Sequence, residues 1–294
     1  MKKNGYQILL PVTVMIWGSL YVAGRAVMEH MPALFLLFLR FSVSAVLLLG
    51  LAGAKKIEKI RREDRWEMFL VGFLGYFLSN AALLLGIQYS NASFASLINA
   101  MSPIFISIFA VLLLGEKMDK RDIISLLIAV AGAVIIIGNP GDSYSVFGIL
   151  SSIVSLIVWS YTMIHIKKLT AKYDPVMVTG CGMGIAAVLS LPASLLYMKV
   201  SGEAVEMRTD LILPVLYICV ICTAVSHVMW NYALKRTDAT KCAAYYPIQP
   251  LTSMVLGILL LHEHISMNFI LGAVLVLAAM AIHASPGHRF SPGS

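Results

Sequence analysis

The sequence predicts an all-α membrane protein with ten transmembrane helices, arranged as two inverted five-helix repeats. Three observations carry this prediction: the composition, a long internal duplication and the distribution of positive residues. Hydrophobic residues make up 59% of the 294 residues and charged residues only 13%, whereas a soluble domain carries about 25% charged residues. This composition cannot cover a water-soluble surface, so the chain is expected to lie in a membrane.

The duplication is the strongest internal signal. The stretch Ser79–Glu116 recurs without a gap at Ser226–Glu263, so that Pro103 aligns with Pro250 and the two terminal glutamates align with each other. Leucines match easily by chance in an apolar chain, but a proline inside an apolar run and a glutamate at its end do not. The match indicates a diverged internal duplication.

Ten apolar stretches approach the roughly 20 residues that a helix needs to cross a bilayer. The breaker cluster Gly138–Asp142 separates the chain near its midpoint. We therefore expect a first five-helix repeat over residues 1–141, a second over 142–285, and a disordered tail over 286–294. The expected spans are 6–26, 33–53, 66–87, 92–114, 120–138, 147–166, 175–198, 210–234, 240–261 and 266–284.

The positive residues set the expected orientation. With the N-terminus in the cytoplasm, nearly all lysines and arginines outside the spans fall on the cytoplasmic side, and the opposite side receives only Lys199 and Arg208. By the positive-inside rule, both termini are cytoplasmic and the protein lies in the cytoplasmic (inner) membrane. Orientation thereby explains the net charge of +7, and no nucleic-acid partner is expected.

The odd number of spans in each repeat determines how the copies relate. A five-span unit ends on the side opposite its start, so the second copy enters the membrane upside down. Inverted repeats commonly form transporters that move between two nearly equivalent packings, with the substrate site between the halves near the midplane.

Several features together resemble the EamA-type exporters of the drug/metabolite transporter superfamily. Trp17 and Trp159 stand in the first helix of each repeat, and Pro32 precedes the pair Arg40-Phe41 in the second span. The endings of spans four and nine, which run from a proline to a glutamate, complete the pattern. The resemblance covers about residues 6–284.

This resemblance implies a ten-helix fold and a central cavity lined by spans one, three, four, six, eight and nine. Members of the family export amino acids, other metabolites or drugs, so the pattern is informative for fold and weak for substrate. The chain departs from the pattern at His262, where the first copy carries Gly115 before its glutamate. That departure concerns the conformation of the loop.

Polar residues inside the expected spans fall on one face of six helices, at helical spacing. These are the same six spans that the resemblance nominates. A polar group in hydrocarbon needs a partner or a wet cavity, so the faces are expected to surround an aqueous pocket. The competing interpretation is that they only join helices, at about 0.6 kcal/mol per contact. The predicted substrate-binding residues are Trp17, Tyr21, Tyr76, Asn80, Asn99, Trp159, His227, Trp230, Asn231, Tyr245, Tyr246 and Gln249.

Two prolines and one arginine inside spans have alternative interpretations. Pro103 and Pro250 remove a backbone hydrogen bond within a helix, and they act either as paired hinges or as fixed bends that shape the packing. Arg40 lies deep in span two. It either contacts a carboxylate or phosphate, or pairs with carbonyl groups or with Glu29 at the outer rim, which is the preferred interpretation.

None of the 15 acidic residues falls in the middle of a span. Proton antiporters for cationic drugs typically rely on an intramembrane carboxylate, so that mode of export is disfavoured, and His227 is left as a weak candidate proton carrier. Glu116 and Glu263 are expected to be structural turn residues that suit the dipole of the next helix. No catalytic, metal-binding, cofactor-binding or ATP-binding motif is present, which predicts a non-enzyme that transports by a secondary or passive mechanism.

The sequence thus favours an exporter of a small polar or amphipathic metabolite, such as an amino acid, that works by alternating access. The alternative is a translocase or enzyme that acts on lipid-linked anionic intermediates, with Arg25 or Arg40 holding phosphate. A purely structural membrane subunit would leave the mid-span amides unexplained. Expected partners are the metabolite and membrane lipids. A homodimer through Gly180 and Gly184 is also considered, although packing of that pair within the monomer is preferred.

Overall fold

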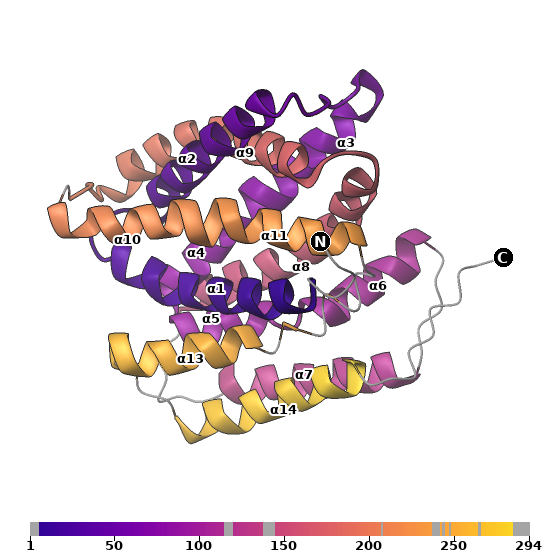
Figure 1. Cartoon of the computed structure of the whole chain (residues 1–294). Helices are drawn as coiled ribbons and strands as arrows, with labels where there is room; N and C mark the ends of the chain where they lie inside the picture. The colour runs from indigo at the N-terminus through magenta and orange to yellow at the C-terminus, as the bar shows by residue number, and fades with distance from the viewer. Residues whose placement is uncertain are drawn as a thin grey trace.

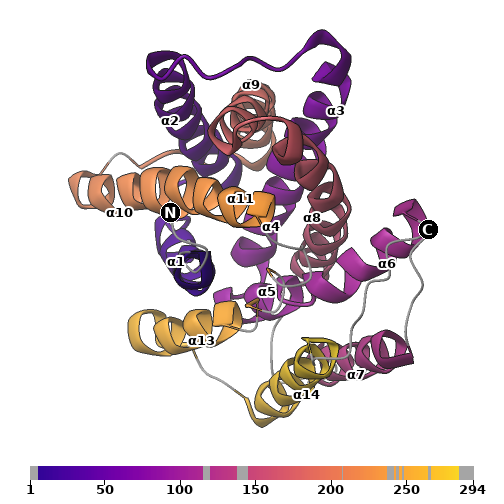
Figure 2. The same ribbon diagram turned by 45° about the vertical axis from the view of Figure 1, so that its right-hand side comes forward.

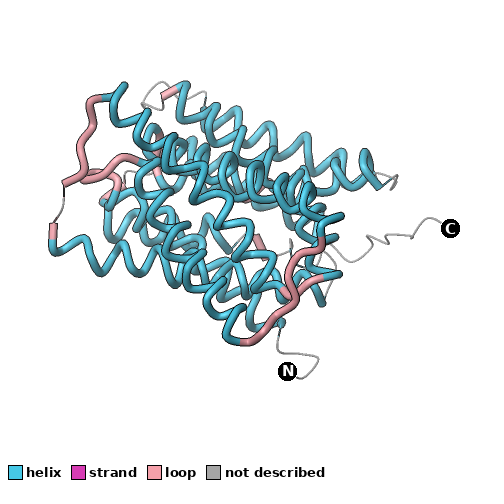
Figure 3. Tube along the Cα trace, turned by 90° about the horizontal axis from the view of Figure 1, so that it is seen from above, coloured by secondary structure: helices cyan, strands magenta, loops and turns pink. Residues whose placement is uncertain are grey.

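The computed structural model describes residues 6–114, 120–137, 145–206, 208–236, 242, 245–246, 248–263 and 266–284. Over these residues the fold is all-helical and contains no strand (Figure 3), as the sequence predicts. Seven helices are long and apolar enough to cross a membrane, and three shorter apolar helices accompany them. The protein is therefore a multi-pass helical membrane protein, while the count of ten spans and the repeat boundaries stay predictions. The expected tail lies outside the described residues.

The first half contains helices close to the expected positions. They are α1 (Tyr6–Val27), α2 (Ala33–Ala54), η1 (Arg62–Asp64), α3 (Arg65–Leu70), η2 (Val71–Leu78), α4 (Ser79–Tyr89), α5 (Ala92–Asn99), α6 (Ser102–Leu114) and α7 (Lys120–Ile137). The elements from η1 to α4 follow one another without a break and form one long helix. Its central part, η2, is a π-helical segment, which contains more residues per turn than an α-helix.

The second half repeats this order. Its elements are α8 (Val146–Lys172), α9 (Pro175–Ser201), η3 (Thr209–Leu211), α10 (Ile212–Leu216), η4 (Tyr217–Val225), α11 (Ser226–Arg236), α13 (Ile248–Leu261) and α14 (Met267–Ala284). The 3₁₀ turn, the short helix, the π-helical segment and the helix that follows all recur at the offset that aligns Ser79 with Ser226. The elements of Arg62–Tyr89 thus have counterparts in Thr209–Arg236.

Span four differs from the single helix expected over 92–114. The chain leaves the helix at Ala100 and Met101, between α5 and α6. Pro103 lies in the first turn of α6, and Pro250 lies in the first turn of α13, where a missing N–H costs little. The expectation that Pro103 interrupts a continuous helix is therefore wrong, because the break comes before it. The hinge role of the two prolines stays a prediction.

The helices form two flanking pairs with a central group between them (Figures 1 and 2). At one end α2 packs against α9, and at the other α7 packs against α14. Gly180 on α9 faces Leu48 on α2, and Gly184, one turn later, faces Ala45. The two helices therefore run in opposite directions. The same contacts show that the glycine pair packs within the monomer.

Candidate functional site

A central cavity lies where helices of the two halves meet. It is partly open to its surroundings. The helices that line it are α1, α2, α4, α5, α6, α8, α11 and α13, together with Tyr246 just before α13. The lining residues are Trp17, Leu20, Tyr21, Arg40, Ser79, Asn80, Leu83, Asn99, Ser102, Ser155, Trp159, His227, Tyr246 and Gln249.

Eight of the twelve predicted site residues line this cavity, and four do not. Those that line it are Trp17, Tyr21, Asn80, Asn99, Trp159, His227, Tyr246 and Gln249; those that do not are Tyr76, Trp230, Asn231 and Tyr245. Helical spacing therefore placed eight of the twelve on faces that line the cavity, and their role in substrate binding stays a prediction.

Trp17 is the centre of the aromatic wall. Its ring centroid lies 6.2 Å from that of Trp159, 5.2 Å from that of His227 and 4.9 Å from that of Trp230. Its Nε1 donates a hydrogen bond of 3.0 Å to Ser226 Oγ on α11. The indole N–H is thus satisfied by the protein, and the ring provides the flat surface expected from the sequence.

Three of the four residues outside the cavity join helices. Asn231 Nδ2 donates to Tyr76 Oη over 3.2 Å and to Thr179 Oγ1 over 2.8 Å, which ties α11 to η2 and α9. Trp230 is 1% exposed and packs edge-on against Tyr246, with ring centroids 5.2 Å apart. For these three residues the geometry matches helix-joining contacts.

The cavity amides form hydrogen bonds close to their own backbone. Asn80 Nδ2 donates to the carbonyl of Gly75 over 3.0 Å, and Asn99 Nδ2 donates to the carbonyl of Ala95 over 3.0 Å. Ser155 Oγ donates to Asn99 Oδ1 over 3.0 Å. These contacts fix the orientation of the amides and use some of their hydrogen-bonding capacity.

His227 is 5% exposed, and its Nδ1 lies 2.9 Å from the carbonyl oxygen of Thr223. Because a carbonyl oxygen only accepts, this hydrogen bond assigns the proton to Nδ1 and leaves Nε2 as an acceptor. A second cavity contact joins Trp159 Nε1 to Tyr246 Oη over 2.9 Å. The proton-carrying role of His227 stays a prediction.

Arg40 is the one fully buried charge on the cavity wall. Its relative exposure is 0%, and its Nε donates to Thr223 Oγ1 over 3.0 Å. Within the described part of the chain, Nη1 and Nη2 have no hydrogen-bond partner. The preferred sequence interpretation, pairing with carbonyl groups or with Glu29, is therefore wrong.

Six lining residues are absent from the predicted set: Leu20, Arg40, Ser79, Leu83, Ser102 and Ser155. Two signals were available, because Leu83 shares the helix face of Asn80 and Ser155 lies on the stripe that contains Trp159. Serine is also common where helices pack closely. The identity of a serine alone therefore does not separate a cavity position from a packing position.

Arg25 and Glu263 bind helix ends rather than each other or the cavity. Arg25 Nη1 donates to the carbonyls of Ile87, over 2.9 Å, and Gln88, which belong to the last turn of α4. A cation at a helix C-terminus is favoured by the helix dipole.

Glu263 accepts hydrogen bonds from Ala92 N over 2.9 Å and from Ser93 Oγ over 2.5 Å. It therefore caps the start of α5, and the expectation that it acts on the next helix along the chain is wrong. His262, just before it, has a φ of 52°, in the left-handed region that glycine adopts most easily. The loop thus keeps a glycine-like conformation without a glycine. Glu116 lies outside the described residues.

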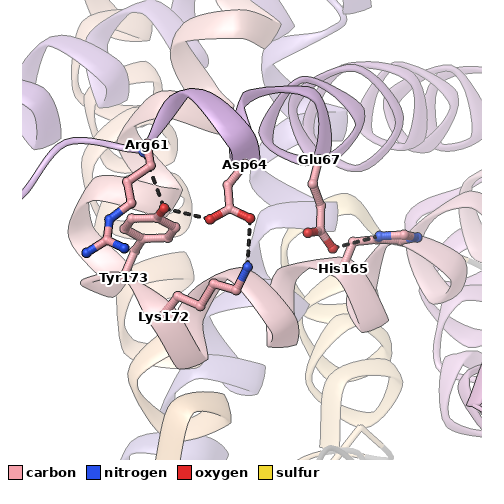
Figure 4. A network of polar contacts seen from close by, with 6 residues as sticks. All are labelled: Arg61, Asp64, Glu67, His165, Lys172 and Tyr173. Atoms are coloured by element: carbon pink, nitrogen blue, oxygen red, sulfur yellow. Dashed lines mark hydrogen bonds and ion pairs between the residues drawn. The ribbon is translucent and has the colours of Figure 1, made fainter.

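A separate polar network, which we call the Asp64 cluster, joins the start of α3 to the end of α8 (Figure 4). Asp64 accepts hydrogen bonds of 2.7 Å from Lys172 Nζ and from the Tyr173 hydroxyl. The bond to Asp64 raises the pKa of Tyr173. Beside it, His165 Nδ1 lies 3.1 Å from Glu67 Oε1. In this cluster Asp64 faces a partner of opposite charge, Lys172.

Known proteins resemble this chain over most of its length. The sequence model of the EamA-like transporter family matches it twice, over residues 5–138 and 146–284. An uncharacterized transporter of Bacillus subtilis (strain 168), YvbV, is 26% identical over 282 residues, which covers 95% of this chain and 92% of the relative. A probable terminal-alkyne amino-acid exporter of Streptantibioticus cattleyicolor is 28% identical over 250 residues, covering 84% and 82%.

A solved crystal structure has the same fold. It aligns with a TM-score of 0.68 over 93% of this chain and 94% of its own, at 19% sequence identity. The likeness concerns the backbone alone.

Proposed function

Because this chain belongs to the EamA-like transporter family, we propose that it exports a small polar or amphipathic metabolite by alternating access between two inverted repeats. An amino acid or an analogue is the first candidate, and the name of the Streptantibioticus cattleyicolor relative, an amino-acid exporter, supports that choice. Transport is secondary or passive. The protein lies in the cytoplasmic membrane with both termini in the cytoplasm.

The observation that carries this proposal is the central cavity. Its wall combines Trp17 and Asn80 from the first half with Trp159 and Gln249 from the second. A site between two repeats changes its access when the halves rock against each other. The opposite directions of α2 and α9, which occupy corresponding places in the two halves, support the inverted arrangement.

The proposed hinges lie beside this cavity. Pro103 follows the break between α5 and α6, and Pro250 occupies the corresponding position in α13. The break leaves backbone groups without helical partners, so a change of angle there disrupts fewer hydrogen bonds than it would inside a continuous helix. This geometry supports a role in rocking.

The alternative function, action on lipid-linked anionic intermediates, has less support. It requires an apolar path from the lipid to Arg25 or Arg40. A large apolar pocket does lie among α2, α3 and α9, with Lys56, Lys59 and Arg65 among its lining residues. Neither Arg25 nor Arg40 lines it.

Transport assays test the proposed function. The purified protein is first screened against metabolites by thermal shift, then reconstituted into liposomes for counterflow of L-amino acids. Single alanine variants of four lining residues, Asn80, Trp159, His227 and Gln249, are compared with a Leu196→Ala control, whose leucine is 64% exposed on α9. We expect the cavity variants to lose flux and the control to keep it. Full flux in all four well-expressed cavity variants would show that this site is wrong.

The coupling mechanism needs its own measurement. If His227 carries a proton, counterflow should change with pH. Flux that is independent of pH would remove this role and leave transport down the substrate gradient.

A further inference from the structure

We propose that Arg40 and Gln249 bind the two charged ends of a zwitterionic amino acid: Arg40 takes its carboxylate, and the side-chain carbonyl of Gln249 accepts from its ammonium group. This inference rests on the proposed transport function and goes further, because it assigns a ligand chemistry and an orientation. The two residues come from different halves, so the ligand would bridge them.

The Arg40 side chain is fixed through Nε, while its two terminal nitrogens form no hydrogen bond in the described part of the chain. Its Nε donates to Thr223 Oγ1, and Thr223 Oγ1 in turn donates to the carbonyl of Ile218 over 2.7 Å within η4. The guanidinium carbon lies 5.1 Å from the centre of the Phe41 ring. These contacts fix one edge of the guanidinium group. Nη1 and Nη2 are buried and have no partner in the described part of the chain.

Within the described residues, no carboxylate balances this charge. The ionisable groups near Arg40 include Cys222, Cys219, Tyr21 and His227, and none of them is a carboxylate. No aspartate or glutamate lines the cavity. A buried guanidinium without a counter-ion is costly to the fold, so the arrangement favours an anion supplied from outside. Two adjacent N–H groups match a carboxylate in the bidentate geometry typical of arginine.

Packing alone does not require an arginine at this position. Counted from Pro32 and Pro175, which open α2 and α9, the counterpart of Arg40 in the second half is Met183. Met183 is fully buried, as Arg40 is. The positive charge is therefore confined to one of two equivalent places, which is expected of a binding group and not of a structural element that the fold needs in both halves.

Gln249 supplies the complementary acceptor. Among residues that line the cavity, the buried polar side-chain atoms without a partner in the described structure are Arg40 Nη1, Arg40 Nη2 and Gln249 Oε1. Two donors and one acceptor match a ligand that carries an anion at one end and an N–H donor at the other. The indole faces of Trp17 and Trp159 also attract a cation, which favours an ammonium group.

Counterflow with matched competitors tests this assignment. The probes are L-phenylalanine, its amide, which keeps the size and the ammonium but lacks the carboxylate, and 3-phenylpropionate, which lacks the ammonium. They compete against the amino acid with the highest flux in the transport assay. We expect both analogues to compete at least about ten-fold more weakly than L-phenylalanine, which corresponds to about 1.4 kcal/mol.

Three variants assign the effect to the two residues. Arg40→Met, which copies the residue of the second half, should abolish the preference for the acid over the amide. Arg40→Lys should keep part of it, because it retains the charge and loses the fork. Gln249→Leu should abolish the preference for L-phenylalanine over 3-phenylpropionate and keep the preference for the acid over the amide. The melting temperature of Arg40→Met should not fall, because an uncompensated buried charge is removed, whereas a structural role would lower it.

The possible results separate the two proposals. Three results would overturn this inference and leave the proposed transport function standing. The amide could compete as well as the acid for amino-acid flux. The Arg40→Met variant could still discriminate between acid and amide, or it could melt at a lower temperature than the wild type. If Arg40→Met does not fold, that result also counts against the inference, and Arg40→Lys still measures discrimination. Absence of flux for every amino acid would overturn the proposed function, and this inference with it.

Discussion

The charged groups Asp64 and Arg40 differ in whether the protein supplies them with hydrogen-bond partners. Asp64 is bound by Lys172 and Tyr173 at 2.7 Å each, and the lysine side chain is 57% exposed to the surroundings. Arg40 is fully buried, holds one neutral partner, and leaves two nitrogens unpaired. The carboxylate of Asp64 has a protein partner for each oxygen, whereas two nitrogens of Arg40 have none in the described part of the chain.

This difference distinguishes residues that stabilise the fold from residues that we propose to bind a ligand. Removing one member of a completed network leaves its partners unsatisfied and costs stability. Removing a buried charge that has no counter-ion leaves no oppositely charged partner unsatisfied, so little stability is lost. The four predictions below test that distinction, starting with the largest expected effect.

Trp17→Ala should destabilise the protein most, although Trp17 lies in the centre beside Arg40. The ring is 6% exposed and contacts Trp159, Trp230 and His227. Truncation of a buried aromatic ring costs about 3–5 kcal/mol, measured as a lower melting temperature in detergent. Trp17→Phe is the control, since it keeps a ring and loses only the bond to Ser226. Equal melting temperatures for Trp17→Ala and the wild type would refute the packing role.

Asp64→Asn should lower the melting temperature by several degrees and leave transport per folded molecule unchanged. The amide removes the charge that Lys172 faces and weakens the hydrogen bond from Tyr173. The matched control is Glu58→Gln, because Glu58 and Arg61 form a pair with both side chains about two-thirds exposed, and exposed pairs contribute little. A change in the substrate selectivity of Asp64→Asn would contradict the claim that this cluster contributes to stability alone.

Glu263→Ala should cost about 1 kcal/mol, the usual contribution of a helix N-cap. Its carboxylate binds the first N–H groups of α5 and the Ser93 hydroxyl. Glu263→Gln should lose less, since an oxygen acceptor remains. The loss is read from hydrogen exchange of the amides at the start of α5. Unchanged protection of Ala92 and Ser93 would show that the cap contributes nothing.

His262→Gly should give the smallest effect and the opposite sign. The φ of 52° is unfavourable for a residue with a Cβ, and glycine removes that cost at the expense of greater freedom in the unfolded chain. The balance at compatible positions is typically a few tenths to about 1 kcal/mol. A rise of a degree or two in melting temperature is expected, and a fall would mean that the His262 side chain makes a stabilising contact.

Local pattern predicted most of the backbone. Apolar length and breakers located the helices, as in α7 and α14, whose starts agree with the expected spans to within one residue. The break at Ala100 and Met101 was missed because neither residue interrupts a helical pattern. The two π-helical segments have no recognisable local signature either, since they depend on side chains and neighbours that form bonds across the turn.

The site was predictable in its helix faces and not in its partners. Spacing placed Trp17, Asn80 and Gln249 on helix faces that line the cavity. It gave no information on which polar atoms are already satisfied, because those contacts join distant parts of the chain: Arg40 meets Thr223, and Asn231 meets Thr179. This is why Arg40 was given the wrong partner, and why Tyr76 was grouped with the cavity instead of with the bonds between helices.

The twin π-helical segments have a consequence for movement. Each accommodates surplus chain in the middle of a long helix, at corresponding positions of the two halves. If one such segment changed to α-helical geometry, the helix beyond it would shift its register by one residue along the axis. The part beyond it would advance by about 1.5 Å and turn by about 100°. Asn80 and His227 stand just beyond these segments, so a slip of one residue would swing each of them without breaking its helix.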